Sequence, residues 1–323
     1  MQRRSLLHTC AALALLGTGA HARAQAGDWP SRPIRIIVPF GAGSGNDIVA
    51  RLIGDHLSRA LGQAVIVDNR VGANGSIGAD AAARSAPDGY TLFVTTNTTQ
   101  AANPSLMKKI SYDPVKDFAP IGRIANTPAM LVVHPSVPAR SMAELIALAK
   151  SRPGKLSYAS GSAGTLVPGA MLTSMAGIDM LHVPYKTIPL GLNDVVAGQV
   201  DMMFTDMATG TPQVKAGKVR ALGVSSLEAS PVLPDVPPID RTLKGFELLA
   251  WYAMYAPAGT PQPIVERLNR EIQAAVGSAT LRERLLALGL QPVTSTPQQL
   301  ADFGRDELAK WTRLIRAAGI QPE

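Results

Sequence analysis

IRIIVPFGAGSGND, residues 34–47, joins a short apolar run to a loop with glycine at positions 41, 43 and 45. The run Ile34–Phe40 is rich in β-branched residues and predicts a buried strand. Residues Asp47–Leu61 follow with apolar side chains near helical spacing, which predicts a helix. A Gly-rich loop between a strand and a helix presents backbone N–H groups and the positive end of a helix dipole. This stretch therefore predicts an α/β fold with an anion site.

The first residues predict an export signal. Arg3 and Arg4 precede a short apolar run from Cys10 to Leu16, and small residues follow around Ala24. This pattern is typical of a cleaved leader, and the apolar run is too short for a spanning helix. We expect a signal peptide over residues 1–24, with cleavage after 24 or 26. The paired arginines leave twin-arginine export open, although the general route is favoured.

The composition of the remaining chain excludes several functions. Loss of three arginines with the leader lowers the formal net charge from +7 to +4. No basic run contains interleaved aromatic residues, so nucleic-acid binding is not expected. The single cysteine, Cys10, lies in the leader, so the exported chain depends on its core rather than on disulfides. No later run is apolar enough for membrane insertion, and the length suffices for two lobes.

Strands and helices alternate along the rest of the chain. Ile34–Phe40 and the predicted strands Ala64–Val67 and Tyr90–Thr95, with helices between them, are typical of a parallel βαβαβ unit. A second unit is predicted after Phe118–Ile124, from strands Leu131–Val133, Leu156–Ala159, His182–Tyr185, Val200–Phe204 and Val219–Val224, with helices at 141–150, 167–176 and 190–197. Further helices are expected after residues 260, 281 and 296. No low-complexity linker separates the units, so we expect lobes packed across a cleft.

Two loops at predicted strand ends resemble each other. Gly41–Asn46 and Ser160–Thr165 are both rich in glycine and serine, follow a strand and precede a helix. Ligands in open α/β sheets bind at this end of the strands. Either loop alone is more often a tight turn. One in each unit favours a clamp for a carboxylate, held by N–H groups and hydroxyls.

Enzyme signatures are weaker. Loop 41–46 is one glycine short of the dinucleotide fingerprint, and neither Ser44 nor Ser162 stands in a Gly-x-Ser-x-Gly elbow. The three histidines of the exported chain show no ligand spacing, so no metal, cofactor or catalytic residue is expected. A catalytic acid–base pair whose members are far apart in the sequence and meet only in the folded protein is still an open alternative. A secreted α/β enzyme acting on a carboxylate is therefore the alternative function.

Ten segments in series carry a resemblance to a known family. They are WPSRPIRIIVPFGAGSGNDIVARLI (29–53), VIVDNRVGANGSIGADAAARSAPDGYTL (65–92), YDPVKDFAPIG (112–122), LVVHPSVPARSMAELIALAKSRPGKLSYASG (131–161), HVPYK (182–186), GQVDMMF (198–204), KAGKVRALGVSS (215–226), LPDVPPI (233–239), YAPAGTPQPIVERLN (255–269) and KWTRLIRAAGI (310–320). In order and spacing the chain resembles the Bug receptors, the substrate-binding receptors of tripartite tricarboxylate transporters.

The resemblance implies a two-lobed periplasmic binding protein of α/β, type II-like fold, with a ligand cleft between lobes and two hinge crossings. Residues 27–125 with 248–323 would form lobe 1 and 126–247 lobe 2, with crossings near Ile124–Pro128 and Glu247–Trp251. The implied function is to bind a small carboxylate by hinge closure: an organic acid, aromatic acid or acidic amino acid. The implied partners are membrane permease subunits or a sensor protein. We expect a periplasmic monomer that is not an enzyme.

The resemblance also implies where the ligand binds. The implied residues are Phe40, Gly41, Gly43, Ser44, Asn46, Asp47, Thr96, Asn97, Ser160, Gly161, Gly164, Thr165, Tyr185, Lys186 and Asp206. Asp206 has two interpretations, because it suits an ammonium group of the ligand and equally suits the N-cap of a helix. Lys186 is expected at the solvated edge of the cleft.

The chain departs from the family pattern near this site. Loop 40–46 replaces a Pro-Gly-Gly type sequence, Leu166-Val167-Pro168 stands where a His-Leu pair is usual, and Thr187–Leu190 replaces a Gly-Ser/Ala-Ala-Pro pattern. The ligand of better-known members therefore does not transfer. Apolar side chains at 166, 167 and 188 favour a less polar acid, aromatic or branched.

Overall fold

A computed structural model describes residues 29–323, so the predicted signal peptide lies outside the described residues. Ten strands form one mixed sheet: β1 Ile34–Val38, β2 Val65–Asn69, β3 Thr91–Thr96, β4 Phe118–Val133, β5 Ser157–Ser160, β6 Leu181–Pro184, β7 Met202–Asp206, β8 Arg220–Val224, β9 Leu249–Pro257 and β10 Gln291–Pro292. The helices are α1 Gly45–Leu61, α2 Ser76–Ala83, α3 Asn103–Leu106, α4 Met142–Ser151, α5 Ala163–Ala176, α6 Ile188–Val196, α7 Met207–Lys215, α8 Gln262–Gly277, α9 Ala279–Ala287 and α10 Pro297–Ala317, with short helical turns at Ala73–Gly75, Thr98–Ala102 and Ile239–Arg241.

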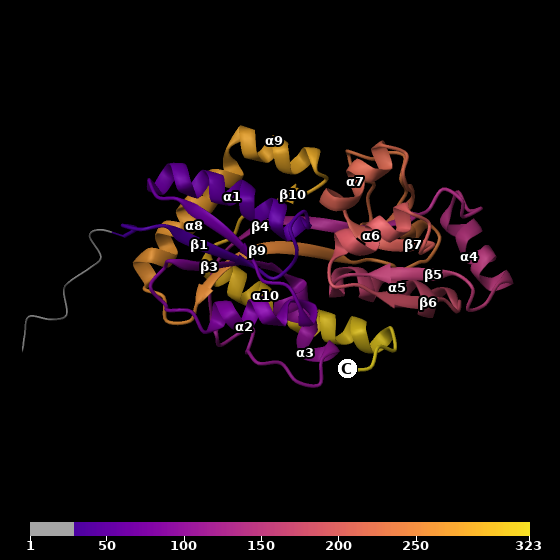
Figure 1. The fold of residues 1–323 in the computed structure, drawn as a ribbon, viewed down its shortest axis with the longest axis horizontal. Coiled ribbons are helices and arrows are strands. Elements are labelled where there is room, and N and C mark those ends of the chain that lie inside the picture. Colours follow the sequence, from indigo (N-terminus) through magenta and orange to yellow (C-terminus); the bar gives the residue numbers. More distant parts are fainter. Residues whose placement is uncertain (1–28) are drawn as a thin grey trace, which may run out of the picture.

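The sheet has two halves that share their central strands. Its order is β2-β1-β3-β9-β4-β7-β5-β6, and β8 and β10 also pair with β4. We call the part around β1, β2 and β3, with α1, α2 and α8, the β1 half. The part around β5, β6 and β7, with α4 to α7, is the β5 half (Figure 1). β1 pairs in parallel with β2 and β3, and β5 with β6 and β7, so parallel pairing is confirmed in each half.

β4 joins the two halves. Its 16 residues pair with β9 from Phe118 to Pro128 and then with β7 and β8 from about Met130 onward, all antiparallel. The predicted strand Leu131–Val133 is only the end of a longer one, because residues 118–128 already pair with β9. Leu131–Val133 consequently runs antiparallel to β7 instead of starting a parallel unit. The predicted crossings at 124–128 and 247–251 lie in or next to β4 and β9, side by side.

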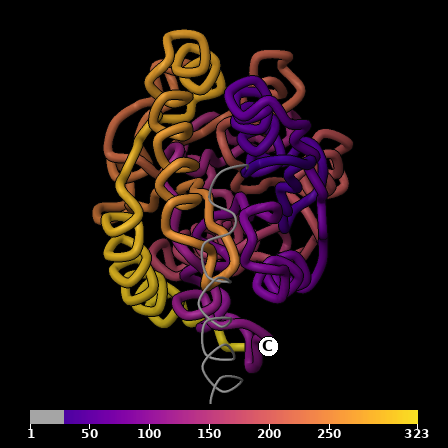
Figure 2. Tube along the Cα trace, turned by 90° about the vertical axis from the view of Figure 1, so that its left-hand side faces the viewer, coloured from indigo at the N-terminus to yellow at the C-terminus, as the bar shows by residue number. Residues whose placement is uncertain are grey.

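The hydrophobic core largely follows this division, but some side chains pack into the cluster of the other half. Ile36, Val49 and Leu268 belong to a cluster inside the β1 half. Trp311 and Ile315 of α10, in contrast, belong to the same buried cluster as β4, β7 and α5 of the β5 half. Figure 2 shows α10 in yellow along one side of the molecule, ending beside the chain near α3. The amide of Lys108 donates to the carbonyl of Glu323 at 2.8 Å. The C-terminal section thus contacts both halves.

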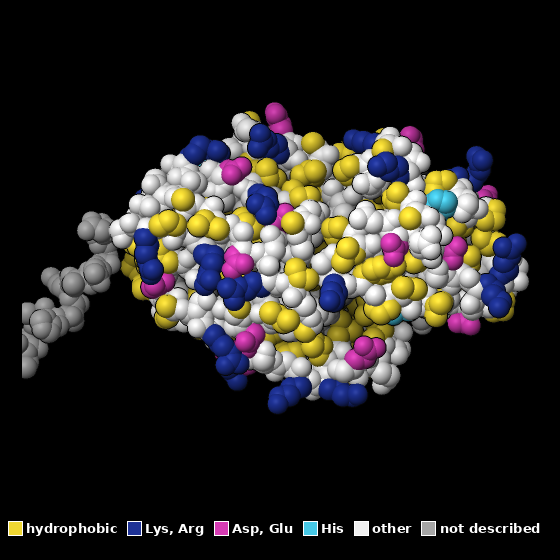
Figure 3. All heavy atoms as spheres, viewed as in Figure 1, with side chains coloured by type: hydrophobic (Ala, Val, Ile, Leu, Met, Phe, Trp, Pro, Cys, Tyr) yellow, Lys and Arg dark blue, Asp and Glu magenta, His cyan; other side chains and the backbone are white. Residues whose placement is uncertain are grey.

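The surface carries charge of both signs. On the face drawn in Figure 3, Lys and Arg side chains alternate with Asp and Glu side chains and with apolar ones. This matches the expectation of scattered charge from the sequence. Within residues 29–323, no helix has both the length and the apolar character needed to cross a membrane.

Candidate ligand-binding site

A small cavity of about 30 Å³ lies between the two halves, over β4 and β9. Its lining residues are Phe40, Ser44, Gly45, Asn46, Thr96, Asn97, Thr98, Thr127, Pro128, Ala129, Ser162, Gly164, Thr165, Ile188, Asp206, Ala250 and Tyr252. One water needs roughly 10–15 Å³ by this measure, so the space accommodates about two waters. The walls come from both halves, and the floor comes from the two shared strands.

Four helices begin at this cavity. α1 follows Ser44, α5 follows Ser162, α6 follows Thr187 and α7 follows Asp206, and each of these N-cap residues has extended backbone angles. The first-turn N–H groups of a helix have no intrahelical acceptor, and the helix dipole is positive at that end. Four such ends around one space create a positive potential without a positive side chain. Among the lining residues there is no Lys, Arg or His.

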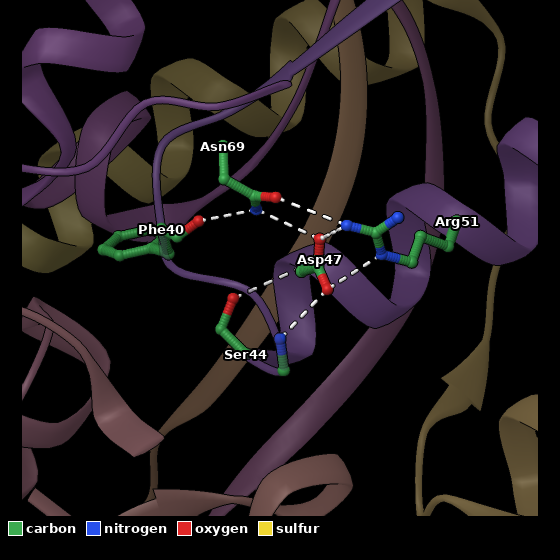
Figure 4. A network of polar contacts seen from close by, with 6 residues as sticks. Phe40, Ser44, Asp47, Arg51 and Asn69 are labelled. Atoms are coloured by element: carbon green, nitrogen blue, oxygen red, sulfur yellow. Dashed lines mark hydrogen bonds and ion pairs between the residues drawn. The ribbon is translucent and has the colours of Figure 1, made fainter. Parts of the chain in front are cut away.

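A polar network fixes the first loop, Gly41–Ser44 (Figure 4). Asp47 accepts from the amide of Gly43 at 3.0 Å and from Arg51 Nε at 3.0 Å. Asn69 donates its Nδ2 to the carbonyl of Phe40 at 2.9 Å and to Asp47 Oδ1 at 3.0 Å. Burial raises the pKa of Asp47, but hydrogen bonds from Arg51, Gly43 and Asn69 outweigh it and leave the pKa lowered. Asp47 is therefore an anchor of the loop and lies outside the cavity lining.

Thr165 organises the second loop, Ser160–Thr165. Its hydroxyl accepts from the amides of Gly161 and Ser162 at 2.9 and 3.2 Å and donates to the carbonyl of Ser162 at 3.0 Å. These contacts hold the loop against the first turn of α5, with Ser162, Gly164 and Thr165 facing the cavity. The two Gly/Ser loops are thus brought together across one space, as the sequence predicted.

Three buried polar groups on the cavity wall have no hydrogen-bond partner among residues 29–323. They are Asn46 Nδ2, Asn97 Nδ2 and Thr98 Oγ1, and their residues are 5%, 1% and 0% exposed. Asn97 uses its Oδ1 to accept from Thr96 at 2.6 Å, which leaves the amino group as the free part. Buried polar groups are nearly always paired, so three free groups at one cavity indicate a binding site for an acceptor.

Two glycines allow the halves to meet. A Cβ on Gly41 would lie 3.0 Å from Cγ2 of Thr187, across the cleft. A Cβ on Gly45 would overlap the Tyr252 hydroxyl and lie 2.9 Å from Asp206 Oδ1. The backbone of Gly45 has no positive φ, so glycine is needed there for space and not for backbone conformation. We call Gly41 and Gly45 the contact glycines.

Asp206 has one of its predicted roles in this structure. Its Oδ1 accepts from the amide of Thr209 at 2.9 Å and its Oδ2 from the Thr209 hydroxyl at 2.8 Å, so it is the N-cap of α7. Its carboxyl also lies at the cavity, close to Gly45 and Tyr252. Burial raises the pKa of Asp206 despite the Thr209 hydrogen bonds. Burial, and then the nearby Asp206, raises the pKa of Tyr252 well above its ordinary value.

Of the other predicted residues, Gly41 and Gly43 line neither this cavity nor the wider second one, and four lie around the second. Ser160, Gly161, Tyr185 and Lys186 line the second cavity, of about 920 Å³, together with residues 72–74, 106–108 and 320–323. There Ser160 Oγ lies 2.7 Å from His182 Nε2, and Tyr185 donates to Asp194 at 2.6 Å. Lys186 is exposed, as expected for an edge residue.

Of the three apolar residues at which the chain departs from the family pattern, one lines the first cavity. Ile188 lines it, whereas Leu166 lines the second cavity and Val167 is part of the buried core. The apolar part of the cavity wall thus comprises Ile188 together with Phe40 and Ala250, and the predicted preference for a less polar acid stays a prediction.

Sequence reasoning missed the floor of the cavity. Thr127, Pro128 and Ala129 come from β4, and Ala250 and Tyr252 from β9. The sequence does carry a signal for the floor, because the predicted crossings at 124–128 and 247–251 lie at or next to these positions and chain crossings form the floor of a cleft between lobes. Gly45 was also missed as an individual residue. No group of three or more possible metal ligands occurs in the part of the chain that the structure describes.

Comparisons with known proteins agree with this geometry. The model of the tripartite tricarboxylate transporter family receptor matches residues 49–320. A UPF0065 protein from the tcbD–tcbE intergenic region of Pseudomonas sp. strain P51 is 39% identical over 310 residues, 94% of this chain and 92% of the relative. Protein BugT of Bordetella pertussis is 35% identical over 309 residues, 94% of each chain.

Solved structures give the same result. R. palustris Rpa4515 with adipate superposes with a TM-score of 0.90 at 34% identity, covering 92% of this chain and 100% of that one. The periplasmic binding protein BugD gives 0.87 at 34% identity, covering 91% and 100%. MatC of Rhodopseudomonas palustris with bound malate gives 0.85 at 32% identity, covering 89% and 100%. The resemblance seen in the sequence is confirmed: the chain belongs to the tripartite tricarboxylate transporter receptor family, whose members are periplasmic solute-binding proteins and not enzymes.

Proposed function

We propose that this chain is an exported, periplasmic receptor that binds a small carboxylate and passes it to membrane permease subunits or to a sensor protein. The observation that carries the proposal is the cavity where four helix N-termini meet three unpartnered buried groups, Asn46 Nδ2, Asn97 Nδ2 and Thr98 Oγ1. Such groups stabilise an anion by N–H and O–H donation without a counter-ion. The relatives that hold adipate and malate support the choice of a carboxylate.

The same geometry supports binding by hinge closure. Residues 27–125 with 248–323 act as lobe 1 and residues 126–247 as lobe 2, with β4 and β9 as the crossings. In this form the cavity between the halves, of about 30 Å³, is too small for a six-carbon diacid. The ligand therefore binds a more open form, and contacts from both lobes then favour closure around it with a wider cavity than this one. Nothing in this mechanism needs a second copy, so we propose a monomer.

A thermal-shift panel tests the function. A ligand present at a hundredfold its Kd stabilises the folded state by about 2.7 kcal/mol, which raises Tm by several degrees. We expect adipate, malate or succinate to raise Tm and uncharged diols of equal length to leave it unchanged. Native mass spectrometry before and after incubation should return the acid chemically unchanged. Failure of every carboxylate in a broad panel would contradict the proposal.

Variants of the cavity then locate the binding. Asn97→Ala and Asn46→Ala remove the free amide donors, and we expect each to weaken carboxylate binding tenfold or more, since a hydrogen bond to a charged group contributes about 1.5–3 kcal/mol. Asn193→Ala, at an exposed position of α6, is the matched control and should bind like the unmodified chain. Equal affinity of all three variants would place the ligand elsewhere.

A further inference from the structure

Among residues 29–323, Asp206 is the only charged residue that lines the first cavity. It is 7% exposed, and each of its oxygens accepts one hydrogen bond from Thr209. A carboxylate has about four lone-pair sites, so its two oxygens retain accepting capacity beyond those bonds. Its Oδ1 lies close to the start of α1, where Gly45 leaves the space free. The carboxyl of Asp206 therefore lies beside the donors that we assign to the ligand.

The surroundings of Asp206 contain no compensating cation. β9 faces it with the hydroxyl of Tyr252, α1 faces it with the backbone of Gly45, and its own helix α7 supplies Thr209. Tyr252 is the titratable neighbour among these groups, and it is neutral at physiological pH because burial raises its pKa well above 10. A dicarboxylate dianion placed here would add two negative charges beside a third.

Like charges a few ångströms apart in a water-poor site cannot all stay ionised, so one carboxyl retains or gains a proton. Within this cavity the proton has two possible holders, the second carboxyl of the ligand and Asp206 itself. The raised pKa of Asp206 favours the same outcome. A proton between the two carboxyl groups gives one O–H donor and one acceptor, which satisfies the spare lone pairs of Asp206 with a charge-assisted bond.

We propose that the ligand is a dicarboxylic acid bound together with one proton, which is shared between its second carboxyl and Asp206. The proton comes from solvent on closure, and no bond between heavy atoms forms or breaks. Asp206 thereby determines specificity: the helix N-termini and free amides hold one carboxylate, and Asp206 accepts from the protonated end. This inference rests on the proposed function and names the charge state of its ligand.

Calorimetry in two buffers of different ionisation enthalpy tests it, using whichever of adipate, succinate and malate binds most tightly. At pH 7 we expect uptake of one proton per ligand and a tenfold weaker Kd for each unit of pH above that. Asp206→Asn should abolish the uptake and reduce the pH dependence, because its amide donates directly to a dianion. Asp179→Asn removes one exposed charge outside the cavity, and it should retain both the proton uptake and the pH dependence of Kd.

The outcomes are distinct. Binding of a diacid without proton uptake overturns the shared proton but leaves the receptor function intact. Uptake that persists in Asp206→Asn overturns the role of Asp206. If Asp206→Asn fails to fold, Asp206→Glu must retain the uptake, and its loss there also overturns the assignment. Failure of all three acids to bind overturns this inference, whereas the proposed function is overturned only if every carboxylate of the broader panel also fails.

Discussion

The amide of Gly43 donates to Oδ2 of Asp47 at 3.0 Å, so the first loop is fastened to the helix that follows it. The same oxygen accepts from Arg51, and the other accepts from Asn69 on the neighbouring strand β2 (Figure 4). The loop therefore has its shape before a ligand arrives. Preorganisation of this kind lowers the ordering cost of binding.

Asp47→Asn should cost about 2 kcal/mol of folding free energy at pH 7, since hydrogen bonds to a charged group are lost. The folded-state pKa of Asp47 is lowered. Its contribution is therefore complete above the unfolded value of about 3.9 and is lost as pH falls through the lower folded value. Thermal unfolding at pH 7 and pH 3 should show the difference between the two proteins shrinking at pH 3. Asp55→Asn, exposed on the same helix, should change little.

Gly45→Ala should hold the two halves apart. The added methyl approaches Asp206 across the cleft and overlaps the Tyr252 hydroxyl of its own lobe. We expect carboxylate affinity to fall at least tenfold, and the overlap with the buried Tyr252 to lower the free energy of unfolding by about 1–3 kcal/mol. Small-angle scattering with saturating ligand should give a larger radius of gyration than the unmodified protein. Gly277→Ala, where a Cβ meets nothing within 4 Å, is the control.

Glu307→Ala should destabilise the fold more than any surface change on α10. Glu307 Oε2 accepts from the indole nitrogens of Trp251 and Trp311 at 2.9 and 3.0 Å, which ties α10 to β9. Removal leaves two buried N–H groups unpaired, at a cost of about 1–3 kcal/mol each. Denaturant unfolding monitored by tryptophan fluorescence measures this loss. Replacing the exposed neighbour, Asp306→Ala, should change the free energy of unfolding by less than about 0.5 kcal/mol. Equal effects of the two substitutions would contradict the role of Glu307 in joining α10 to β9.

In the ligand-free protein, the contribution of Asp206 to stability should depend on pH in the opposite direction to that of Asp47. Its folded-state pKa is raised by burial, so the folded state binds more protons than the unfolded state. Stability from this group is complete below the unfolded value of about 3.9 and falls as pH rises through the folded value. Tm of Asp206→Asn minus Tm of the unmodified protein should therefore increase between pH 4 and pH 7. A constant difference would contradict the raised pKa.

The loops could be predicted from the sequence because their signals are local. Glycines at 41, 43 and 45 after a β-branched run indicate a strand, a turn and a helix start, and the structure has β1, a loop and α1 there. The helix begins at Gly45 with Ser44 as N-cap, two residues before the predicted start, because a Ser side chain caps as well as the later Asp. The second loop, before α5, was predicted for the same reason.

The central strands could not be predicted in this way. β4 contains Asn126, Thr127 and Pro128, which by composition indicate a break, yet they pair with β9. β9 itself was not predicted as a strand. Its partners, β3 and β4, are far from it in the chain, so the pairing energy that extends these strands is absent from any local window. Tyr252 and Thr127 were missed as cavity residues for that reason.

The contact glycines also determine how this receptor can be redesigned. A library aimed at a new acid gains little from these two positions, since a Cβ at 45 would overlap Tyr252 and one at 41 would press against Thr187. Positions 97 and 188 line the cavity, whereas Asp206 also caps α7 through Thr209. Under the proposed hinge closure, we expect a selection restricted to positions 97 and 188 to alter which acid is bound and to retain the closing movement.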